Sequence, residues 1–271
     1  MNWTKEAEDA VSRVPFFVKK RVRKRVEEEA ARQGSREVNM GHVRTCQKRY
    51  LSDMEEEVAG FQVETCFGPS GCPNRAAADD GMASRIEELL KRKNLRAFLI
   101  DKVKGSLKMH HEFRVSISDC PNACSRPQIA DIGLIGASNP AVGNESCSGC
   151  GACVEACREE AVELSDADSG PAIDYDRCLL CGKCCKACPT GTLSEAKRGW
   201  RIIIGGKLGR HPQLGRELEG IFLQDEALTV IDMCIDFYMK YAVEGERFGE
   251  VINKAGFKAV ENFLDVGRLL I

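Results

Sequence analysis

Eight of the fifteen cysteines in this 271-residue chain follow a ligand spacing that occurs twice. The first run is Cys147-x2-Cys150-x2-Cys153-x3-Cys157, and the second is Cys178-x2-Cys181-x2-Cys184-x3-Cys188. Three closely spaced thiolates can wrap one iron-sulfur cubane, while the fourth, further along the chain, reaches the other cubane. The spacing therefore predicts two 4Fe-4S clusters, one held by Cys147, Cys150, Cys153 and Cys188, and the other by Cys157, Cys178, Cys181 and Cys184.

The residues around these runs bear on the alternatives. Paired Cys-x2-Cys segments also bind zinc, but eight cysteines in a doubled frame favour two cubanes. The frame resembles the bacterial two-cluster ferredoxin, in which proline follows each run. Here Pro189 follows the second run, whereas Arg158 follows the first. Cys185 is an extra thiol, either a small buried residue or a replacement ligand.

Four further cysteines form two pairs, Cys66-x5-Cys72 and Cys120-x3-Cys124. Two pairs make one four-thiolate site, so a third 4Fe-4S cluster is expected here. Cys46 and Cys234 have no partner at a ligand spacing and are predicted to be structural.

Short strands are expected to position the cysteine pairs. A strand predicted at 61–65 leads into the loop of the first pair, and an amphipathic helix is predicted at 83–93. Apolar and polar residues alternate over 113–118, which predicts a strand that ends beside Cys120. A further strand is expected at 201–204, before Gly205-Gly206.

The chain is predicted to be an α+β protein in three parts. The stretch 139–196 differs in composition from both flanks and contains the cysteine repeat, which indicates an inserted two-cluster domain. It divides a core domain predicted at 55–138 and 197–271. Residues 1–54 are predicted to form a separate helical module.

The N-terminal module is expected to begin its main helix near Pro15. Gly34 is expected to end that helix and Ser35 to open the next. The helix combines an apolar stripe of Val14, Phe16, Phe17, Val18, Val22 and Val26 with a basic face of Lys19, Lys20, Arg21, Arg23, Lys24 and Arg25. That face is either solvated or a clamp for carboxylates of a tetrapyrrole or an acidic partner.

Composition indicates a globular protein with a net charge of -2 and 30% charged residues, which predicts neither nucleic-acid binding nor attraction to an anionic membrane. No apolar run reaches the roughly 20 residues of a membrane span, and the first ten residues do not have the pattern of a signal peptide. Cysteines at metal-ligand spacings predict a reducing, cytoplasmic location and a need for anaerobic conditions.

The core cysteine pairs lie in the segments 65–73 and 119–126, which resemble the 4Fe-4S and sirohaem half-site of sulfite and nitrite reductases. The resemblance continues at 128–136 and 205–212, covers roughly 60–260, and extends to the dissimilatory enzymes that carry a ferredoxin insert. It implies a sulfite-reductase-like α/β core that binds sirohaem, with Cys124 bridging the third cluster to the sirohaem iron.

The resemblance also implies roles for polar residues. Gly205 and Gly206 would let the backbone approach the cofactor, although the pair can also be a plain turn after a strand. Donors to the cofactor carboxylates would be Lys207, Arg210 and His211. Charge on a small oxyanion such as sulfite or nitrite would be neutralised by Arg114, Lys207 and Arg210, with His110 and His111 as surface residues or proton donors.

Two features depart from the family pattern. Glu112 stands where the family usually has a basic residue, and its carboxylate is expected to repel an oxyanion. The usual half-unit before the first cysteine pair is replaced by a module similar to the small helical domain of light-independent protochlorophyllide reductase. Either a second copy of the chain or a partner subunit completes the pocket, or the pocket is not a sulfite site.

Three functions follow as hypotheses. The first is a sirohaem-dependent oxidoreductase or subunit that receives electrons from a donor protein and passes them through three 4Fe-4S clusters to a small oxyanion. The second is an electron-transfer subunit without sirohaem chemistry of its own. The third is a tetrapyrrole-binding or sensing protein, supported by the basic helix alone.

Overall fold

The computed structural model describes residues 1–56, 58–77, 81–164 and 170–265. The chain divides into two compact units, 1–59 with 105–110 and 60–104 with 111–271. Helices and strands are mixed along the chain, which confirms the predicted α+β class. Positions 57, 78–80, 165–169 and 266–271 of the three predicted domains lie outside the described residues.

The first unit is a small helical module. Its helices are α1 (Lys5–Ser12), α2 (Phe16–Arg32) and α3 (Met40–Glu56), and its two short strands, β1 (Asn2–Trp3) and β2 (Glu37–Val38), are parallel. The core contains Ala7, Val26, Ala30 and Val38. Pro15 precedes α2, as predicted, because its fixed φ suits a helix start.

Several expectations for this module are wrong. Phe16 and Phe17 are 89% and 75% exposed, so the first turn of α2 is outside the buried stripe. Ser35 does not open α3; its hydroxyl accepts a hydrogen bond from the Glu37 N–H. Asn39 takes that place, because its Oδ1 accepts the His42 N–H at the start of α3.

The predicted basic face of α2 is only partly available to a ligand. The Arg23 guanidinium lies 4.5 Å from the centre of the Trp3 ring and forms an ion pair with Glu8 at 3.1 Å. The Arg25 guanidinium lies 5.5 Å from the centre of the Tyr50 ring. These two cations therefore pack on the aromatic rings of their own module.

The second unit is built on a five-stranded sheet in the order β3-β4-β5-β8-β9. Strands β3 (Phe61–Thr65), β4 (Phe113–Ser118) and β5 (Ile132–Val142) are parallel, whereas β8 (Leu193–Ile204) and β9 (Arg216–Glu217) are antiparallel to their neighbours. The predicted strands at 61–65 and 113–118 are confirmed. The strand predicted at 201–204 is the last third of β8.

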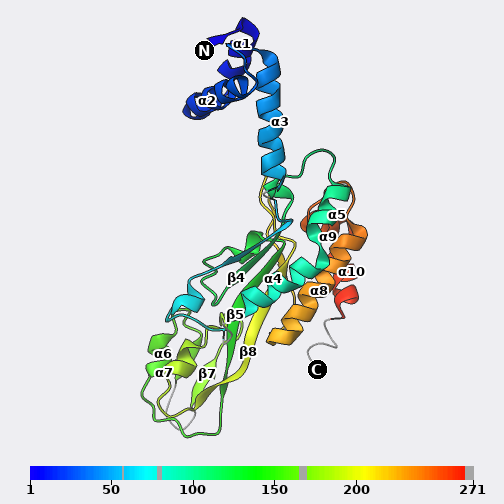
Figure 1. Cartoon of the computed structure of the whole chain (residues 1–271). Helices are drawn as coiled ribbons and strands as arrows, with labels where there is room; N and C mark the ends of the chain where they lie inside the picture. The colour runs from blue at the N-terminus through cyan, green and yellow to red at the C-terminus, as the bar shows by residue number, and fades with distance from the viewer. Residues whose placement is uncertain (57, 78–80, 165–169, 266–271) are drawn as a thin grey trace. The chain divides into compact units, whose positions relative to one another are not determined.

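Helices gather on one face of this sheet (Figure 1). They are α4 (Met82–Lys93), α5 (Leu95–Lys102), α8 (Gln224–Tyr241), α9 (Phe248–Ala255) and α10 (Phe257–Leu264). Phe113 of β4 packs on Tyr238 and Phe248, with ring centres 5.3 and 5.7 Å apart. Because side chains alternate along a strand, Arg114, Ser116 and Ser118 point to the opposite face.

Strands β5 and β8 form a long antiparallel ribbon whose far end carries the cysteine repeat (Figure 1). Its pairing extends from Ile132 with Ile204 to Val142 with Leu193, and its register shifts between Asn139 and Pro140. Beyond the ribbon lie α6 (Ala152–Ala156), β6 (Val162–Leu164), β7 (Pro171–Ile173) and α7 (Lys183–Ala187). The ribbon strands thus continue past the predicted boundaries of the insert at 139 and 196.

Candidate functional site

Two loops at one edge of the sheet bring the core cysteine pairs together. Parallel strands β3 and β4 both end at this edge, so Cys66 and Cys120 follow neighbouring strand ends. The Cys66 sulfur accepts the backbone N–H of Gly68 at 3.3 Å and of Asp119 at 3.2 Å. These bonds tie the first loop to the second at the cysteine itself.

Asp119, which was not singled out from the sequence, organises both loops. Its carboxylate accepts the Arg75 Nε at 2.6 Å, and its backbone carbonyl accepts the N–H groups of Ala76 and Ala77 at 2.8 and 3.0 Å. A Cβ added at Gly136 would lie 2.3 Å from the Asp119 carbonyl oxygen. The loop thus rests directly on strand β5, which only glycine allows.

Serine hydroxyls hold the second loop to the face of the sheet opposite the helices. Ser116 Oγ donates to the Ser125 carbonyl at 2.6 Å, and Ser118 Oγ lies 2.7 Å from Ser125 Oγ. Ser125 is buried, whereas the adjacent Cys124 is exposed. The loop therefore presents the Cys124 thiol outward.

The cysteines of the insert accept hydrogen bonds from nearby backbone N–H groups. Cys147 and Cys178 each accept the N–H two residues later, from Gly149 and Leu180, both at 3.4 Å. The last cysteine of each run also accepts a backbone donor: Cys157 from Ala161 at 3.3 Å, and Cys188 from Leu193 at 3.4 Å. The two halves of the sequence repeat thus have matching local geometry, and such N–H donors stabilise bound thiolates.

Electrostatics group the thiols into two sets of four and one set of three. Burial raises the pKa of Cys120, and the thiols of Cys124, Cys66 and Cys72 raise it further. Burial likewise raises the pKa of Cys178, with additions from Cys184, Cys181 and Cys157. The same applies to Cys153, with additions from Cys188 and Cys147.

Three sets of thiols differ in their members and in their place in the fold. The core set is Cys66, Cys72, Cys120 and Cys124. The inner set is Cys157, Cys178, Cys181 and Cys184. The outer set is Cys147, Cys153 and Cys188, with the exposed Cys150 between the first two in sequence.

The environment of Cys188 favours its thiolate. Burial raises its pKa, but hydrogen bonds from the Leu193 N–H, the Thr190 hydroxyl and neighbouring N–H groups outweigh burial and lower the pKa to about 7. The Cys185 sulfur lies 3.2 Å from the Ser194 carbonyl, to which it donates, and a hydrogen bond with the neighbouring Cys184 lowers the pKa of Cys185 as well. Cys234 is fully buried, and burial raises its pKa, in line with its predicted structural role.

The donor geometry bears on which metal group fits. Within the described part of the chain, no three Cys, His, Asp or Glu side chains converge tightly enough for a single metal ion. A zinc site would need thiolates about 2.3 Å from one centre. A cubane takes four thiolate ligands, which is the number in the core and inner sets, and its irons would also deprotonate the buried thiols.

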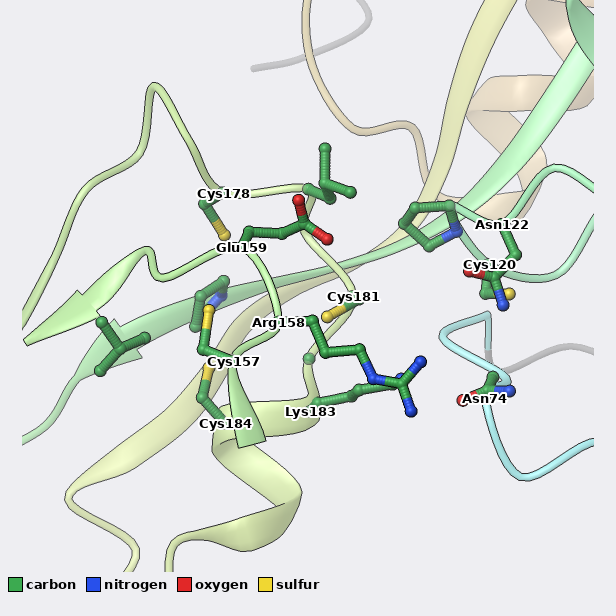
Figure 2. A pocket seen from close by; sticks show the side chains of 15 residues that line it. Asn74, Cys120, Asn122, Cys157, Arg158, Glu159, Cys178, Cys181, Lys183 and Cys184 are labelled. Atoms are coloured by element: carbon green, nitrogen blue, oxygen red, sulfur yellow. The ribbon is translucent and has the colours of Figure 1, made fainter. Parts of the chain in front are cut away.

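A pocket of about 70 Å³ lies between the inner set and the core loops. Figure 2 shows the four inner cysteines on one side of it and Asn74, Cys120 and Asn122 on the other. The Arg158 side chain extends from the insert toward Asn74 in the same view. The pocket therefore joins residues of two predicted centres.

Lys207, Gly205 and Gly206 were expected at a cofactor, but each of them contacts other residues of the chain itself. The Lys207 ammonium is buried and donates to the Glu250 carboxylate of α9 at 2.6 Å. A Cβ at Gly206 would lie 2.4 Å from the Gln128 carbonyl oxygen, and one at Gly205 would lie 2.8 Å from Ile252 Cδ1. The glycine pair thus allows the chain to pack on itself, which agrees with the plain-turn reading.

The remaining predicted residues differ in their surroundings. Arg114 Nε is buried without a hydrogen-bond partner among the described residues, on the face opposite the helices. Arg210 and His211 are exposed in the loop after β8, and His110 is exposed before β4. Glu112 is buried and accepts the Gly60 N–H at 3.3 Å and the Gln62 amide at 2.5 Å, so its carboxylate is engaged at the start of β4, whereas Cys120 follows the other end.

Comparison with known families gives two matches. Residues 62–266 match the family described as the nitrite and sulphite reductase 4Fe-4S domain. Residues 3–46 match the family described as the proto-chlorophyllide reductase 57 kD subunit. Both matches agree with the resemblances drawn from the sequence.

Individual relatives point the same way. The coenzyme F420-dependent sulfite reductase of Methanocaldococcus jannaschii is 40% identical over 149 residues, which cover 54% of this chain and 24% of that protein. One subunit of the anaerobic sulfite reductase of Salmonella typhimurium is 26% identical over 246 residues, which cover 83% of this chain and 68% of that relative. The chain thus spans about a quarter of the methanogen protein.

A solved structure supports the fold. The crystal structure of dissimilatory sulfite reductase I matches 80% of this chain and 57% of its own chain, with a TM-score of 0.53 and 18% sequence identity. In the described parts of the present chain, no helix combines the length and the hydropathy needed to cross a bilayer.

Proposed function

This chain belongs to the nitrite and sulphite reductase 4Fe-4S domain family, and from that premise we propose that it carries three 4Fe-4S clusters and works as a subunit of a sulfite-reductase-type oxidoreductase. The observation that carries the proposal is the grouping of the thiols: the core and inner sets each bring four cysteines within electrostatic reach, and the outer set repeats the inner one. The core and inner sets each match the ligand number of one cubane, and the outer set reaches that number with Cys150, which holds the place in its run that Cys181 holds in the second run.

The residues of this chain have distinct tasks in the proposed reaction. The three cysteine sets would hold the clusters, and clusters bound there would supply single-electron transfer from a donor protein. Backbone N–H donors to the cluster sulfurs hold the ligands in place and favour the reduced state. Arg114 supplies positive charge on the face opposite the helices, where Nε is available to an anionic group.

Sirohaem is proposed as the partner of the core set. When bound, it supplies the metal at which a small oxyanion such as sulfite or nitrite is reduced. The exposed Cys124 fits a bridging ligand, and Arg114, Arg210 and His211 remain available for anionic groups. Lys207, Gly205 and Gly206 do not fit this role, because their side chain or backbone already contacts the chain itself.

That last observation favours a second candidate function. If Lys207 and the glycine pair serve the fold alone, this chain would have fewer contacts for sirohaem than the sequence predicts. An electron-transfer subunit without sirohaem chemistry of its own would then remain, with the same three clusters. Either function needs a reducing compartment, so a cytoplasmic location is proposed from the cysteine usage.

Two measurements test these proposals on the anaerobically purified chain. Iron and sulfide analysis should give about twelve irons per chain in clusters, four for each cubane. A value near eight, about two cubanes, would exclude a cluster in the core set. An absorption spectrum decides between the candidates, because sirohaem gives a Soret band and a red band that clusters lack.

A further inference from the structure

The pocket in Figure 2 shows which cysteine set of the insert faces the core set. It is lined by all four cysteines of the inner set, by Cys120 of the core set, and by no cysteine of the outer set. Electrons entering the insert would therefore leave it through the inner set. This step rests on the proposed function, because it requires clusters at the cysteine sets.

The inner set is also fixed mechanically to the core. The Ser138 N–H of β5 donates to the Leu180 carbonyl at 2.7 Å. A Cβ at Gly182 would lie 2.5 Å from Ser138 Oγ, so the loop packs closely on the strand. In addition, the Lys186 ammonium of α7 donates to the Arg75 carbonyl in the core loop at 2.6 Å. The gap between the two sets is thus held by several contacts.

Arg158 lies in this gap. It follows Cys157 directly, in the position where the repeated pattern has Pro189 after Cys188. Its side chain is exposed to the pocket and has no hydrogen-bond or ion-pair partner among the described residues. Lys183 and Glu159 also line the pocket, so the three side chains together contribute one net positive charge.

A positive charge at this position lowers the energy of an electron that is added to a nearby cluster. Reducing a 4Fe-4S cluster adds one negative charge and changes no covalent bond, so a nearby guanidinium favours the reduced form. An arginine remains charged at every physiological pH. A proline would leave the pocket without this charge.

We propose that Arg158 tunes electron transfer: its positive charge raises the reduction potential of the cluster held by the inner set (the inner centre) relative to the cluster held by the outer set (the outer centre). One electron then leaves the outer centre, which is oxidised, and enters the inner centre, which is reduced, without transfer of a proton. The electron is supplied by the reduced carrier protein of the proposed function, or by dithionite in a test.

The test is a redox titration of the full-length, anaerobically purified chain with dithionite, followed by electron paramagnetic resonance. Cys178→Ser and Cys150→Ser identify the inner and outer signals by altering one set at a time. In Arg158→Met, the ratio of reduced to oxidised inner centre at a fixed potential should fall about tenfold, which is about 59 mV for a one-electron couple. The outer centre should change by less than about twofold.

Two further variants isolate the charge. Arg158→Lys keeps the charge and should stay within about threefold of the unmodified chain, which is about 28 mV by the same relation. Arg177→Met removes a cation that directly precedes Cys178 but is neutralised by Glu160 at 3.1 Å and does not line the pocket, so the ratio for the inner centre should change by less than about threefold. If Arg158→Met does not assemble its clusters, Lys183→Met tests the second cation of the pocket and should lower the inner potential in the same direction.

The titration results separate the role of Arg158 from the presence of the clusters. An inner potential unchanged in Arg158→Met, or lowered equally in Arg158→Lys or Arg177→Met, overturns the role of Arg158 while leaving three clusters in place. If Lys183→Met has to serve as the test, an unchanged inner potential has the same meaning. Absence of the inner and outer signals from the unmodified chain would instead overturn the proposed function, and this inference with it.

Discussion

The guanidinium of Arg247, the residue directly before α9, donates to the fully buried Asp131 carboxylate at the start of β5, at 2.5 Å from one nitrogen and 3.3 Å from another. Asp131 also accepts the backbone N–H of Arg114 at 2.9 Å. One carboxylate therefore joins the helical layer to strands β4 and β5. Its charge is matched inside the protein, which a buried carboxylate requires.

Asp131→Asn should destabilise the protein strongly. The substitution keeps the size of the side chain but removes the charge that faces a largely buried guanidinium, and breaking a buried pair in this way costs about 3 kcal/mol or more. Urea unfolding under anaerobic conditions measures the loss. Asp225→Asn is the matched control, because its pair with Arg85 is exposed and should change stability by less than about 1 kcal/mol. Equal losses in the two variants would contradict the role of Asp131.

Gly136→Ala should disturb the core set without affecting the insert. The new Cβ would lie 2.3 Å from the Asp119 carbonyl oxygen and 2.7 Å from Ala77 Cβ, so the loop that carries Cys120 must move. We expect a loss of about four irons per chain, the content of one cubane, and a stability loss of about 1–3 kcal/mol. Gly143→Ala is the control, since its nearest neighbour would be 3.5 Å away. Full iron content in Gly136→Ala would show that the loop tolerates the shift.

The parts of the fold with a local signal were predictable from the sequence. Alternation marked β4, and a helical apolar period marked α4 to within one residue of its start. Strand β5 was missed because eight of its eleven residues are buried, so the strand lacks the regular alternation of apolar and polar residues that produces a period of two. The start of β8 was missed for the opposite reason, since Ser194, Glu195 and Ala196 are all exposed along the ribbon.

The candidate site likewise has parts that a local sequence signal predicts and parts that no local signal predicts. Cysteine spacing is a local signal, and the thiols of the core and inner sets lie within electrostatic reach of one another. The partners of Lys207 and Asp119 lie 43 and 44 residues away in sequence, so no local pattern reveals them. The exposure of Phe16 and Phe17 was likewise hidden, because an apolar period does not show which turn of a helix is covered.

Lys207→Met should lower stability in a pH-dependent manner. Burial raises the pKa of Glu250, but hydrogen bonds from the Lys207 ammonium and the Arg247 N–H, together with the charges of both residues, outweigh burial and lower the pKa below its usual 4.5. A lowered carboxyl pKa stabilises the fold above about pH 4.5, and this contribution is lost as the pH falls through the lower, folded-state pKa. Because Glu250 is 40% exposed, solvent screening limits the expected loss to about 1 kcal/mol at pH 7.

Unfolding in urea at pH 7 and at pH 4 measures this difference, which should shrink at the lower pH. Lys104→Met, which removes a fully exposed pair with Glu244, serves as the control and should show almost no change. Sirohaem content, if any is present, should be the same in Lys207→Met and in the unmodified chain. A selective loss of sirohaem in Lys207→Met would instead show that Lys207 contributes to binding the cofactor.

Cys124→Ser should separate the core set from the insert. The ligands of the other two clusters all lie between residues 147 and 188, so about eight irons per chain should remain. If Cys124 bridges the two metals, the sirohaem bands should disappear or shift, because the bridging thiolate is gone. Cys185→Ser is the control, since that sulfur donates to the Ser194 carbonyl. Unchanged sirohaem bands and unchanged turnover in Cys124→Ser would exclude the bridge.

The last prediction concerns assembly. The core loops expose Cys124 and the ring of Phe67, which is 84% exposed, although Phe67 directly follows a predicted ligand. A planar macrocycle bound beside these residues would have a large apolar face outside this chain, and such a face is normally covered by another protein surface. A second copy or a partner subunit should therefore cover the core set.

Sedimentation under anaerobic conditions should give a mass above the 29.9 kDa of one chain, either for the purified protein or for the complex isolated from its own cells. Phe67→Ser should weaken this assembly about tenfold or more if the core loops form the contact, since a buried aromatic side chain contributes several kcal/mol. Lys20→Glu tests the other candidate contact, the basic face of α2, and should have no effect in that case. The reverse pattern would place the contact on the helical module, and a stable monomer that binds sirohaem and reduces sulfite or nitrite would show that one chain encloses the whole site.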